Sequence, residues 1–449
     1  MADTIAAVST GQVLAAIGIL RLSGDDTLAV VDRVFFPSHG RKMSERPDRQ
    51  LVFGELHDKN GDTIDICLCT ISRGPGSYTG EDTAEIQCHG SPTVLREGLD
   101  SLFAAGARQA LAGEFTKRAF LNGRMDLTQA EAVIDLIHAE SAECAKNAAG
   151  QLGGAIQRRA DGVYDALRDI SAHYHAVIDY PDDDIEEFTL SSYGKSLETC
   201  ESTLAQLFDS FERGRLMQGG VPAAIVGRPN ARKSSLLNAL LGYERAIVTA
   251  IPGTTRDTIE ERVRFGSVTL RLADTAGVRE TRDEVERLGV ERSRAAMRGA
   301  ELIFVLIDGT QPVTPEDKEL IHTAQSLAKC IVLLTKSDLG TAAEYPGAIR
   351  ISSRTSEGFD RLEAAVSALF PDGGNHAVGE ILTNARQAEA VQRALESVRA
   401  ARGAMAQGFL PDLVLTETEN AMAAIGELTG KTVREDITAR IFERFCVGK

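Results

Sequence analysis

The stretch VPAAIVGRPNARKSSLLNAL, residues 221–240, decides the fold of the central part of the chain. An apolar run ends at a glycine, a polar loop follows, and leucines then recur at helical spacing. Gly227, Lys233 and Ser234 hold the spacing of a phosphate-binding loop, G-x-x-x-x-G-K-[ST], between a strand and a helix. Arg232 stands where the second glycine of that motif is expected. The stretch therefore predicts a nucleotide site whose loop carries one unfavourable residue.

The composition of the whole chain indicates an ordinary soluble globular protein. Its 449 residues are 43% hydrophobic and 25% charged, and this length is typical of about three domains. The formal net charge of -16 argues against a protein that wraps nucleic acid by bulk electrostatics, which needs clustered Lys and Arg. Any contact with RNA must therefore be local or supplied by a partner.

Cysteine usage predicts a reduced, cytoplasmic compartment, because the seven cysteines are an odd number and form no C-x-x-C pair. Cys67 and Cys69 lie on one face of an expected strand and could share a metal, although two buried strand residues are the favoured interpretation. The N-terminus has no basic leader, so we expect no signal peptide. The run LIFVLI at 302–307 is too short to span a bilayer.

Hydrophobic periodicity divides the chain into four segments. We expect an α+β domain over 1–124, a helical domain whose first part covers 125–217, an α/β domain over 218–374, and the second helical part over 375–449. Buried apolar strands that alternate with helices predict a parallel sheet, inserted into the helical domain. The acidic run DYPDDDIEEF is interpreted as a solvated connector.

Further nucleotide-site elements follow the loop in the expected order. Lys233 is expected to reach the outer phosphates, and the Ser234 hydroxyl is expected to hold Mg²⁺. In IPGTTRD, Thr255 offers a second hydroxyl for Mg²⁺, and in ADTAG the spacing places Asp274 by Mg²⁺ and the Gly277 N–H by the γ-phosphate. The predicted phosphate-side residues are Asn230, Ala231, Arg232, Lys233, Ser234, Ser235, Thr249, Ala250, Ile251, Pro252, Gly253, Thr254, Thr255, Asp274, Thr275, Ala276 and Gly277.

The segment TKSD at 335–338 predicts recognition of guanine, because the Asp338 carboxylate can accept both the ring N–H and the exocyclic amine. Thr335, Lys336, Asp338, Ser352 and Ser353 make up the expected base site. These elements resemble a translation-factor-related GTPase domain with a Ras-like α/β fold. Such domains usually carry Asn at the position of Thr335 and Ala at that of Ser353.

The flanking segments resemble the MnmE (TrmE) family of tRNA modification GTPases over essentially the whole chain. The resemblance is carried by AAIGILRLSG, PGSYTGEDTAEIQCHG, GEFTKRAFLNGRMDLTQAEAVIDLI, PGTTRD, DTAGVRETRDEVE and the terminal CVGK. It implies a tetrahydrofolate derivative (5,10-methylene or 5-formyl) bound by Arg21, Glu85 and Arg124 with Cys446 and Lys449 of the tail. Residues 9–14, STGQVL, depart from the Gly/Arg-rich loop of many relatives.

The resemblance also implies how GTP is hydrolysed. Val278 occupies the position at which Ras-like GTPases place a water-orienting Gln. In the family, Glu286 would orient the water, and K⁺ would supply the positive charge of an arginine finger. The implied K⁺ ligands are Asn230, Thr249, Ile251 and Thr254, the implied Mg²⁺ ligands are Ser234 and Thr255, and the implied catalytic residues are Glu286, Lys233 and Thr255.

The function that the resemblance implies is GTP-dependent addition of an aminomethyl or carboxymethylaminomethyl group to C5 of the wobble uridine of certain tRNAs. The implied assembly is a homodimer that joins the FAD-dependent partner MnmG in a heterotetramer and acts on tRNA, with no membrane. Two alternatives stay open. One is a ribosome-assembly GTPase of the Era or Der type, although no GXXG clamp follows the GTPase-like segment. The other is a nucleotide-impaired folate or tRNA scaffold, suggested by Arg232.

Overall fold

The computed structural model describes residues 3–11, 13–179, 189–243, 261–266, 268–272, 296–340, 342–370, 378–408, 411–432, 441–443 and 445–448. The chain forms two compact units. The first comprises Met1–His138, Ala148–Ala205 and Glu389–Lys449, and the second comprises Ala139–Asn147 and Gln206–Ala388. None of the helices in these described ranges is both long and apolar enough to cross a membrane.

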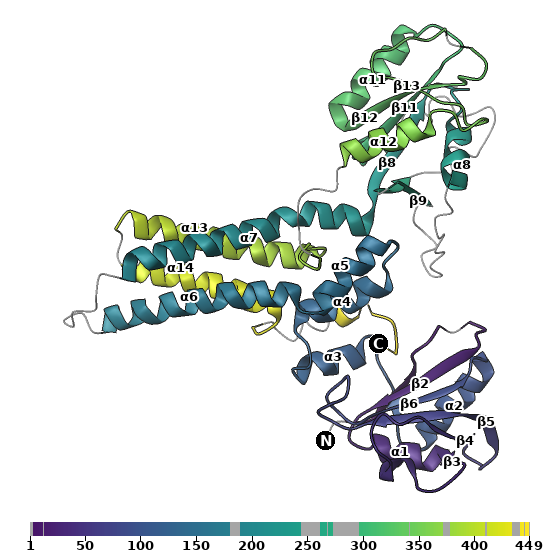
Figure 1. Ribbon diagram of the computed structural model, residues 1–449, viewed down its shortest axis with the longest axis vertical. Coiled ribbons are helices and arrows are strands. Elements are labelled where there is room, and N and C mark those ends of the chain that lie inside the picture. Colours follow the sequence, from purple (N-terminus) through teal and green to yellow (C-terminus); the bar gives the residue numbers. More distant parts are fainter. Residues whose placement is uncertain are drawn as a thin grey trace. The chain divides into compact units, whose positions relative to one another are not determined.

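The first unit opens with a seven-stranded sheet in the order β3-β4-β5-β6-β2-β1-β7 (Figure 1). Neighbouring strands are antiparallel except for the parallel pair β1–β7. The strands are β1 (Ile5–Val8), β2 (Ile17–Ser23), β3 (Phe35–Pro37), β4 (Val52–His57), β5 (Thr63–Ser72), β6 (Thr83–His89) and β7 (Arg108–Gln109), with the short 3₁₀ helix η1 (Met43–Glu45) before β4. The expected α+β domain is confirmed.

One face of this sheet forms a core with helices α1 (Thr27–Val34) and α2 (Pro92–Ala104). Alternating strand residues such as Leu22 and Ile86 point into that core, as the period of two requires. The opposite face leaves Phe53 and Ile66 exposed by 57% and 52%. This open face also carries the charged residues described below.

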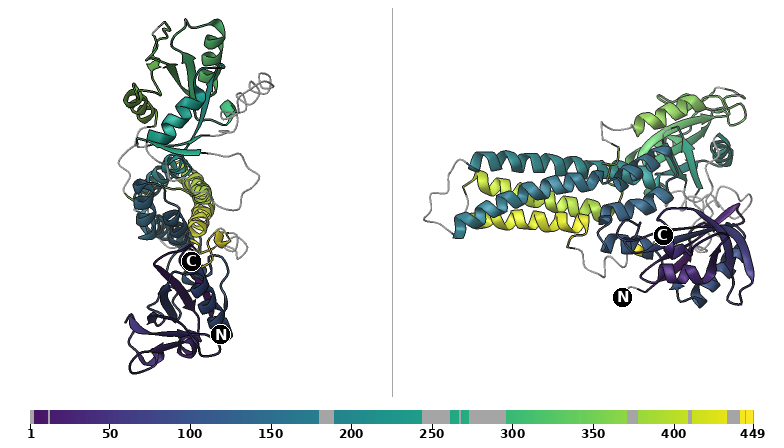
Figure 2. Two further views of the ribbon diagram at one scale, coloured as in Figure 1. Left: turned by 90° about the vertical axis from the view of Figure 1, so that its right-hand side faces the viewer. Right: turned by 60° about the horizontal axis from the view of Figure 1, so that its bottom comes forward.

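The helical part contains α3 (Glu114–Leu121), α4 (Leu127–Ile137), α5 (Ala142–Leu152), α6 (Ala155–Asp179), α7 (Thr189–Gly219), α13 (Ala385–Ala406) and α14 (Pro411–Thr429). Helices α6, α7, α13 and α14 run side by side (Figures 1 and 2). Arg399 of α13 pairs with Glu201 of α7 at 2.9 Å, and His175 of α6 pairs with Glu419 of α14 at 3.0 Å. Helices that precede and helices that follow the α/β segment in the sequence therefore share one bundle, which confirms the expected insertion.

The helical part expected over 125–217 begins with two separate helices, α4 and α5. A capping box formed by Asp126 and Gln129 starts α4, but the helix ends at Ile137. The Ser141 hydroxyl then accepts a 3.1 Å hydrogen bond from the Cys144 N–H at the start of α5. A serine that satisfies a free N–H group favours a new helix start over continuation.

The second unit contains a six-stranded sheet in the order β13-β12-β11-β8-β10-β9 (Figure 1). Its strands are β8 (Val221–Gly227), β9 (Glu261–Phe265), β10 (Val268–Leu272), β11 (Leu302–Asp308), β12 (Lys329–Thr335) and β13 (Ile349–Arg350). Every pair is parallel except β9–β10, which is antiparallel. The expected parallel sheet is therefore a mixed sheet with one antiparallel edge strand.

Both faces of this sheet are covered, which explains the continuous apolar runs of its strands. Helices α8 (Lys233–Tyr243) and α12 (Phe359–Leu369) contribute to one core, which contains Phe304 and Leu333. Helix α11 (Pro315–Leu327) contributes to the other, which contains Val305 and Leu334. The loop after β8 lies at the carboxyl end of a central strand, where α/β folds bind ligands.

Candidate functional site

The phosphate-binding loop links β8 to α8 in the second unit. A Cβ atom on Gly227 would lie 2.6 Å from the carbonyl oxygen of Leu306, so only glycine fits there. The Lys233 ammonium donates to the carbonyl oxygens of Gly227 at 2.8 Å and Arg228 at 3.0 Å. Burial lowers the pKa of Lys233. The lysine therefore lies across the loop, at the N-terminus of the helix where anions bind.

Arg232 has a backbone φ of 65°. This left-handed conformation suits glycine and disfavours a residue with a side chain, which confirms the strain expected at this position. The Arg232 side chain is exposed and has no hydrogen-bond or ion-pair partner among the described residues. Asn230 also has a φ of 65°, a value that asparagine tolerates better than most residues.

The hydroxyl residues that follow the lysine lie at the first turn of α8. Ser234 is exposed and Ser235 is half-buried, whereas Ala231 is buried in the core below the loop. Of the predicted phosphate-side set, residues 230–235 are thus brought together on one loop and helix start.

The expected base site is formed by the ends of two neighbouring strands. Asp338 follows β12, and its Oδ1 accepts a 2.9 Å hydrogen bond from the Ser352 hydroxyl after β13. Thr335 is buried, and its hydroxyl donates to the Ile307 carbonyl oxygen of β11 at 3.1 Å. Thr335 therefore braces the loop through its hydroxyl, where an asparagine would use its amide.

Lys336 and Ser353 complete the described part of the base site. Lys336 has a φ of 60°, and its ammonium pairs with Asp308 Oδ2 at 2.5 Å. Ser353 is half-buried next to Ser352. Of the five predicted base-site residues, Thr335 thus ends β12 and the other four lie on the two adjacent loops at the carboxyl edge of the sheet.

The other nucleotide-site predictions lie outside the described residues. They are Thr249, Ala250, Ile251, Pro252, Gly253, Thr254, Thr255, Asp274, Thr275, Ala276, Gly277 and Glu286.

A second candidate site lies on the open face of the N-terminal sheet. Arg21 and Glu85 are directly opposite each other on β2 and β6. The Arg21 guanidinium donates to Glu85 Oε1 at 2.9 Å, and the two side chains keep 21% and 31% of their surface exposed. The rings of Tyr78 and Phe115 lie 5.9 and 5.8 Å from this guanidinium. Phe115 is fully buried and Tyr78 is 41% exposed, so a flat polar ligand would find both charges and the Tyr78 ring here.

The C-terminal tail lies at this same site. Val447 forms an antiparallel bridge with Ala112, and the Gly448 carbonyl oxygen accepts a 2.9 Å hydrogen bond from the Ser9 hydroxyl. Arg21 Nη1 also reaches that oxygen, at 3.5 Å. Gly448 has a φ of 99°, and a Cβ on it would lie 2.3 Å from the Val8 carbonyl oxygen. The glycine of CVGK is therefore required for this close approach.

Cys446 is exposed next to these tail contacts, and its carbonyl oxygen accepts a 3.3 Å hydrogen bond from the Gly113 N–H. Just before it, the buried side chains of Phe442 and Phe445 pack with Ala130. These aromatic anchors hold the tail against the domain. Lys449 lies outside the described residues.

Arg124 is placed differently from the other predicted ligands. A Cβ atom added to Gly80, in the loop between β5 and β6, would lie 3.3 Å from the Cγ of Arg124. In the same loop, the Thr79 hydroxyl lies 2.7 Å from the Ser23 hydroxyl, two residues beyond Arg21. Arg124 thus lies against the TGED loop and not on the strands that carry Arg21 and Glu85.

Sequence reasoning missed the ion-pair cluster that supports this loop. Arg118 is buried and donates to Glu81 at 3.0 Å and to Glu114 at 3.0 Å. Burial by itself would raise the pKa of Glu114, but hydrogen bonds from Arg108, the Leu111 N–H and Arg118 lower it to about 2. The motif TGED, residues 79–82, is visible in the sequence. Its distance along the chain from α3 gives no sign that Glu81 pairs with Arg118.

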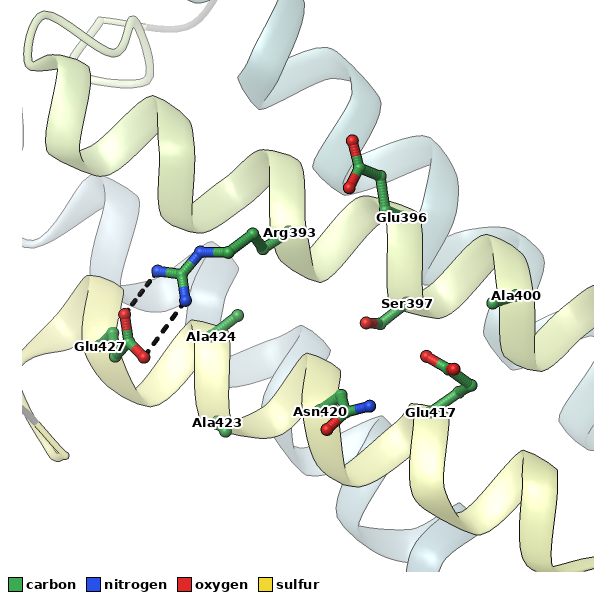
Figure 3. Close-up of a pocket in the computed structure, with 9 residues that line it drawn as sticks. All are labelled: Arg393, Glu396, Ser397, Ala400, Glu417, Asn420, Ala423, Ala424 and Glu427. Carbon is green, nitrogen blue, oxygen red and sulfur yellow. Dashed lines mark hydrogen bonds and ion pairs between the residues drawn. The ribbon is translucent and has the colours of Figure 1, made fainter.

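A groove of 470 Å³ between α13 and α14 contains none of the predicted site residues (Figure 3). Small residues such as Ala423 and Ala424 leave the space open, and Arg393 pairs across it with Glu427. Glu396 and Glu417 make the remaining lining acidic. This lining does not match a phosphate ligand.

The covered sheet, the loop before α8 and the aspartate after β12 define a P-loop nucleotide-binding protein of the GTPase class. Comparison with known proteins narrows this class. The family model "GTP-binding protein TrmE N-terminus" matches residues 4–124, and the model "MnmE helical domain" matches residues 127–446.

Full-length relatives agree with these matches. The protein of Symbiobacterium thermophilum named tRNA modification GTPase MnmE is 41% identical over 456 residues, which is 100% of this chain and 99% of the relative. The protein of the same name from Alkaliphilus metalliredigens is 41% identical over 458 residues, again 100% and 99% of the two chains. The chain belongs to the MnmE family.

Proposed function

We propose that this protein hydrolyses GTP and uses the cycle to drive modification of tRNA at C5 of the wobble uridine. The observation that carries the proposal is the presence, in one chain of the MnmE family, of a phosphate-binding loop and of a second polar site at which the chain's own C-terminus lies beside Arg21. The added group would be an aminomethyl or carboxymethylaminomethyl group.

GTP would bind at the carboxyl edge of the second unit's sheet. Lys233 would exchange its two carbonyl partners for phosphate oxygens, and the N–H groups at the start of α8 would cradle the rest. Asp338, held by Ser352, would accept the two guanine N–H donors. Because adenine lacks that pair of donors, the site would select GTP over ATP.

Cations would complete the phosphate site. The exposed Ser234 hydroxyl at the first turn of α8 suits Mg²⁺, which prefers oxygen ligands, with Thr255 as the second hydroxyl. Asn230 would bind K⁺ together with Thr249, Ile251 and Thr254. The two ions neutralise charge on the phosphates when bound. Glu286 would orient the attacking water.

A tetrahydrofolate derivative would bind at the Arg21–Glu85 site. The Glu85 carboxylate can accept adjacent N–H donors of a pterin, and Arg21 or Arg124 can pair with the carboxylates of a glutamate tail. Arg21 already joins Glu85 to the C-terminal tail. A ligand bound there would therefore affect the tail segment that carries Cys446 and Lys449. The folate would supply the one-carbon unit.

The proposed assembly is a homodimer of 1–124 domains that joins MnmG and tRNA in the cytoplasm. The exposed Phe53 and Ile66 on the open sheet face favour a protein partner on that side. The net charge of -16 supports this division of labour, because the partner would provide most of the basic surface for tRNA. The domain assignment 1–124, 125–217, 218–374 and 375–449 remains part of the proposal.

Mass spectrometry of wobble nucleosides tests the function directly. In cells that lack this protein, the 5-aminomethyl-type uridines should disappear, and the intact gene should restore them. Unaltered wobble uridines in such cells would refute the proposal. A ribosome-assembly role of the Era or Der type would instead change rRNA processing and leave these nucleosides in place.

The second candidate is a nucleotide-impaired folate or tRNA scaffold. One observation favours it, the left-handed backbone of Arg232 in the phosphate loop. Under this alternative, purified protein would show no GTP turnover above a Lys233→Ala variant, while wobble modification would still require the chain.

A further inference from the structure

Two buried cysteines and an aspartate converge at one end of the N-terminal sheet. Cys67 of β5 and Cys88 of β6 are 5% and 2% exposed. Their sulfur atoms and a carboxylate oxygen of Asp65 all lie within 4.8 Å of one another. We propose that these three residues form a binding site for a thiophilic divalent cation of the Zn²⁺ class.

Strand pairing brings the three ligand atoms together. In the antiparallel pair β5–β6, Leu68 lies opposite Gln87, so the next position along places Cys67 opposite Cys88. Opposite residues on one face of such a pair have Cβ atoms about 5 Å apart. Asp65 precedes Cys67 by two residues and therefore shares its face. The cluster is a product of the sheet register and not of a local sequence motif.

The Asp65 carboxylate is already oriented by its neighbours. Oδ1 accepts hydrogen bonds from the Ile66 N–H and from His89 Nδ1, each at 2.8 Å. Oδ2 accepts a 2.8 Å hydrogen bond from the His89 N–H. The Asp65 side chain is only 9% exposed, whereas the His89 side chain is 75% exposed. Such outer partners fix the orientation of metal-binding carboxylates.

The ligand types select the ion. Thiolates favour Zn²⁺ over Mg²⁺ and Ca²⁺, which prefer oxygen. Three protein ligands leave one position of a tetrahedral ion for water or a small ligand. The site therefore differs from the Mg²⁺ site proposed beside GTP. An ion here would link β5 to β6 at Cys88, three residues from Glu85 on the same strand. This inference does not depend on the proposed function.

Cys69 provides a matched control. It lies on the same strand and face as Cys67 and is fully buried, but it is opposite Ile86 and not opposite a thiol. From the sequence alone, Cys67 and Cys69 could share a metal. The strand register instead places Cys67 beside Cys88.

The test is a Co²⁺ titration of the reduced, chelator-treated full-length protein in excess Mg²⁺, which occupies sites made of oxygen ligands only. The wild type and Cys69→Ser should bind about one Co²⁺ per chain with thiolate-to-metal absorption, and Zn²⁺ should displace it. Cys67→Ser and Cys88→Ser should lose that absorption. Absence of a thiolate band in the wild type would overturn the site.

Two variants at the partly exposed end of the cluster, Asp65 and His89, keep the test decisive if the cysteine variants misfold. Asp65→Asn should weaken Co²⁺ binding tenfold or more, and His89→Ala should weaken it by about tenfold through loss of carboxylate orientation. Zn²⁺ should also raise the thermal unfolding midpoint of the wild type and not of Asp65→Asn. Unchanged Co²⁺ affinity in both variants would refute the assignment even if Cys88→Ser fails to fold.

Discussion

The hydroxyl of Ser352 donates a 2.9 Å hydrogen bond to Oδ1 of Asp338, and so joins the loops after two neighbouring strands. The Ser352 N–H in turn donates to the Glu357 carbonyl oxygen at 3.1 Å. The aspartate is thereby held in one orientation before any base arrives. A carboxylate fixed in this way loses little conformational freedom when it accepts two donors from guanine.

Replacement of Asp338 by Asn should weaken GTP binding by about a hundredfold, because an amide donor then faces the guanine donors. The variant should gain affinity for xanthosine triphosphate, whose ring presents an acceptor in place of the exocyclic amine. Ser352→Ala should have a smaller effect in the same direction. Equilibrium binding of labelled nucleotides would measure all three, with Asp360→Asn, at an exposed position of α12, as the control. Unchanged GTP affinity of Asp338→Asn would show that this segment does not contact the base.

Much of the fold was predictable because its signals are local. The buried strands β11 and β12 are continuous apolar runs, and their alternation with helices predicts a covered sheet. The antiparallel strand β9 was not predicted, because Glu261–Phe265 mixes charged and apolar residues as an edge strand does. Its direction depends on the partner strand, which no periodicity reveals.

The candidate sites were predictable to different degrees. Lys233 and Asp338 follow from short motifs, and the structure places both at the carboxyl edge of one sheet. The pairing of Arg21 with Glu85 depends on a strand register that joins residues far apart in the sequence. The same holds for Cys67 and Cys88. Long-range register is fixed by packing and turns, so sequence spacing alone could not supply these pairs.

Truncation after Phe445, or Cys446→Ser, should abolish wobble modification and leave GTP hydrolysis intact. The tail contacts Ala112, Ser9 and Arg21 of the first unit, whereas the phosphate loop belongs to the second. Nucleoside mass spectrometry and a phosphate-release assay would measure the two activities. Cys330→Ser, at a half-buried cysteine of the second unit, is the control. An equal loss of GTP hydrolysis would contradict the proposed separation of the two sites.

The N-terminal domain should lose stability in acid because of Glu114. Its pKa is lowered from 4.5 to about 2 in the folded state, so the stabilisation it provides is present above pH 4.5 and is lost as the pH falls from about 4.5 towards 2. Glu114→Gln should cost about 3 kcal/mol at neutral pH, because it removes the carboxylate that pairs with both Arg108 and Arg118 and whose pKa those pairs lower. The variant should also lose the pH dependence in that window.

Amide hydrogen exchange of peptides that cover residues 108–121 would measure this effect locally, which suits a chain of several domains. Asp48→Asn is the control, because the exposed pair Asp48–Arg73 should contribute less than about 1 kcal/mol. Equal protection of Glu114→Gln and wild type at neutral pH would show that the cluster does not stabilise the domain.

GTP hydrolysis should be faster in KCl than in NaCl, because Val278 stands where a water-orienting Gln is expected and the site would need the added positive charge of K⁺. Asn230→Gly should remove the difference. Glycine keeps the left-handed backbone of residue 230 and deletes only the amide. Asn238→Ala, on the exposed side of α8, should retain it. Equal rates of the wild type in the two salts would exclude the potassium role.

We expect Arg232 to limit how tightly the loop binds nucleotide. Its φ of 65° places an L residue in a conformation that costs about 1 to 3 kcal/mol relative to glycine. The backbone N–H that would face the phosphates is nevertheless present, and Lys233 and Ser234 keep their positions. We therefore expect GTP binding to be weakened by roughly one to two decades and not abolished, at about 1.4 kcal/mol per tenfold.

Two substitutions separate backbone strain from charge at this position. Arg232→Gly should tighten GTP binding by about tenfold or more and raise turnover at subsaturating GTP, because it removes the strain. Arg232→Ala keeps the strain and removes the guanidinium, so it should bind GTP more weakly than the wild type if that exposed charge attracts phosphate. Arg228→Ala, elsewhere on the loop, controls for the loss of a nearby arginine. If the wild type binds GTP as tightly as Arg232→Gly, the strain argument is wrong. If neither binds GTP, the scaffold alternative is favoured, because restoring the glycine would then have failed to restore the nucleotide site.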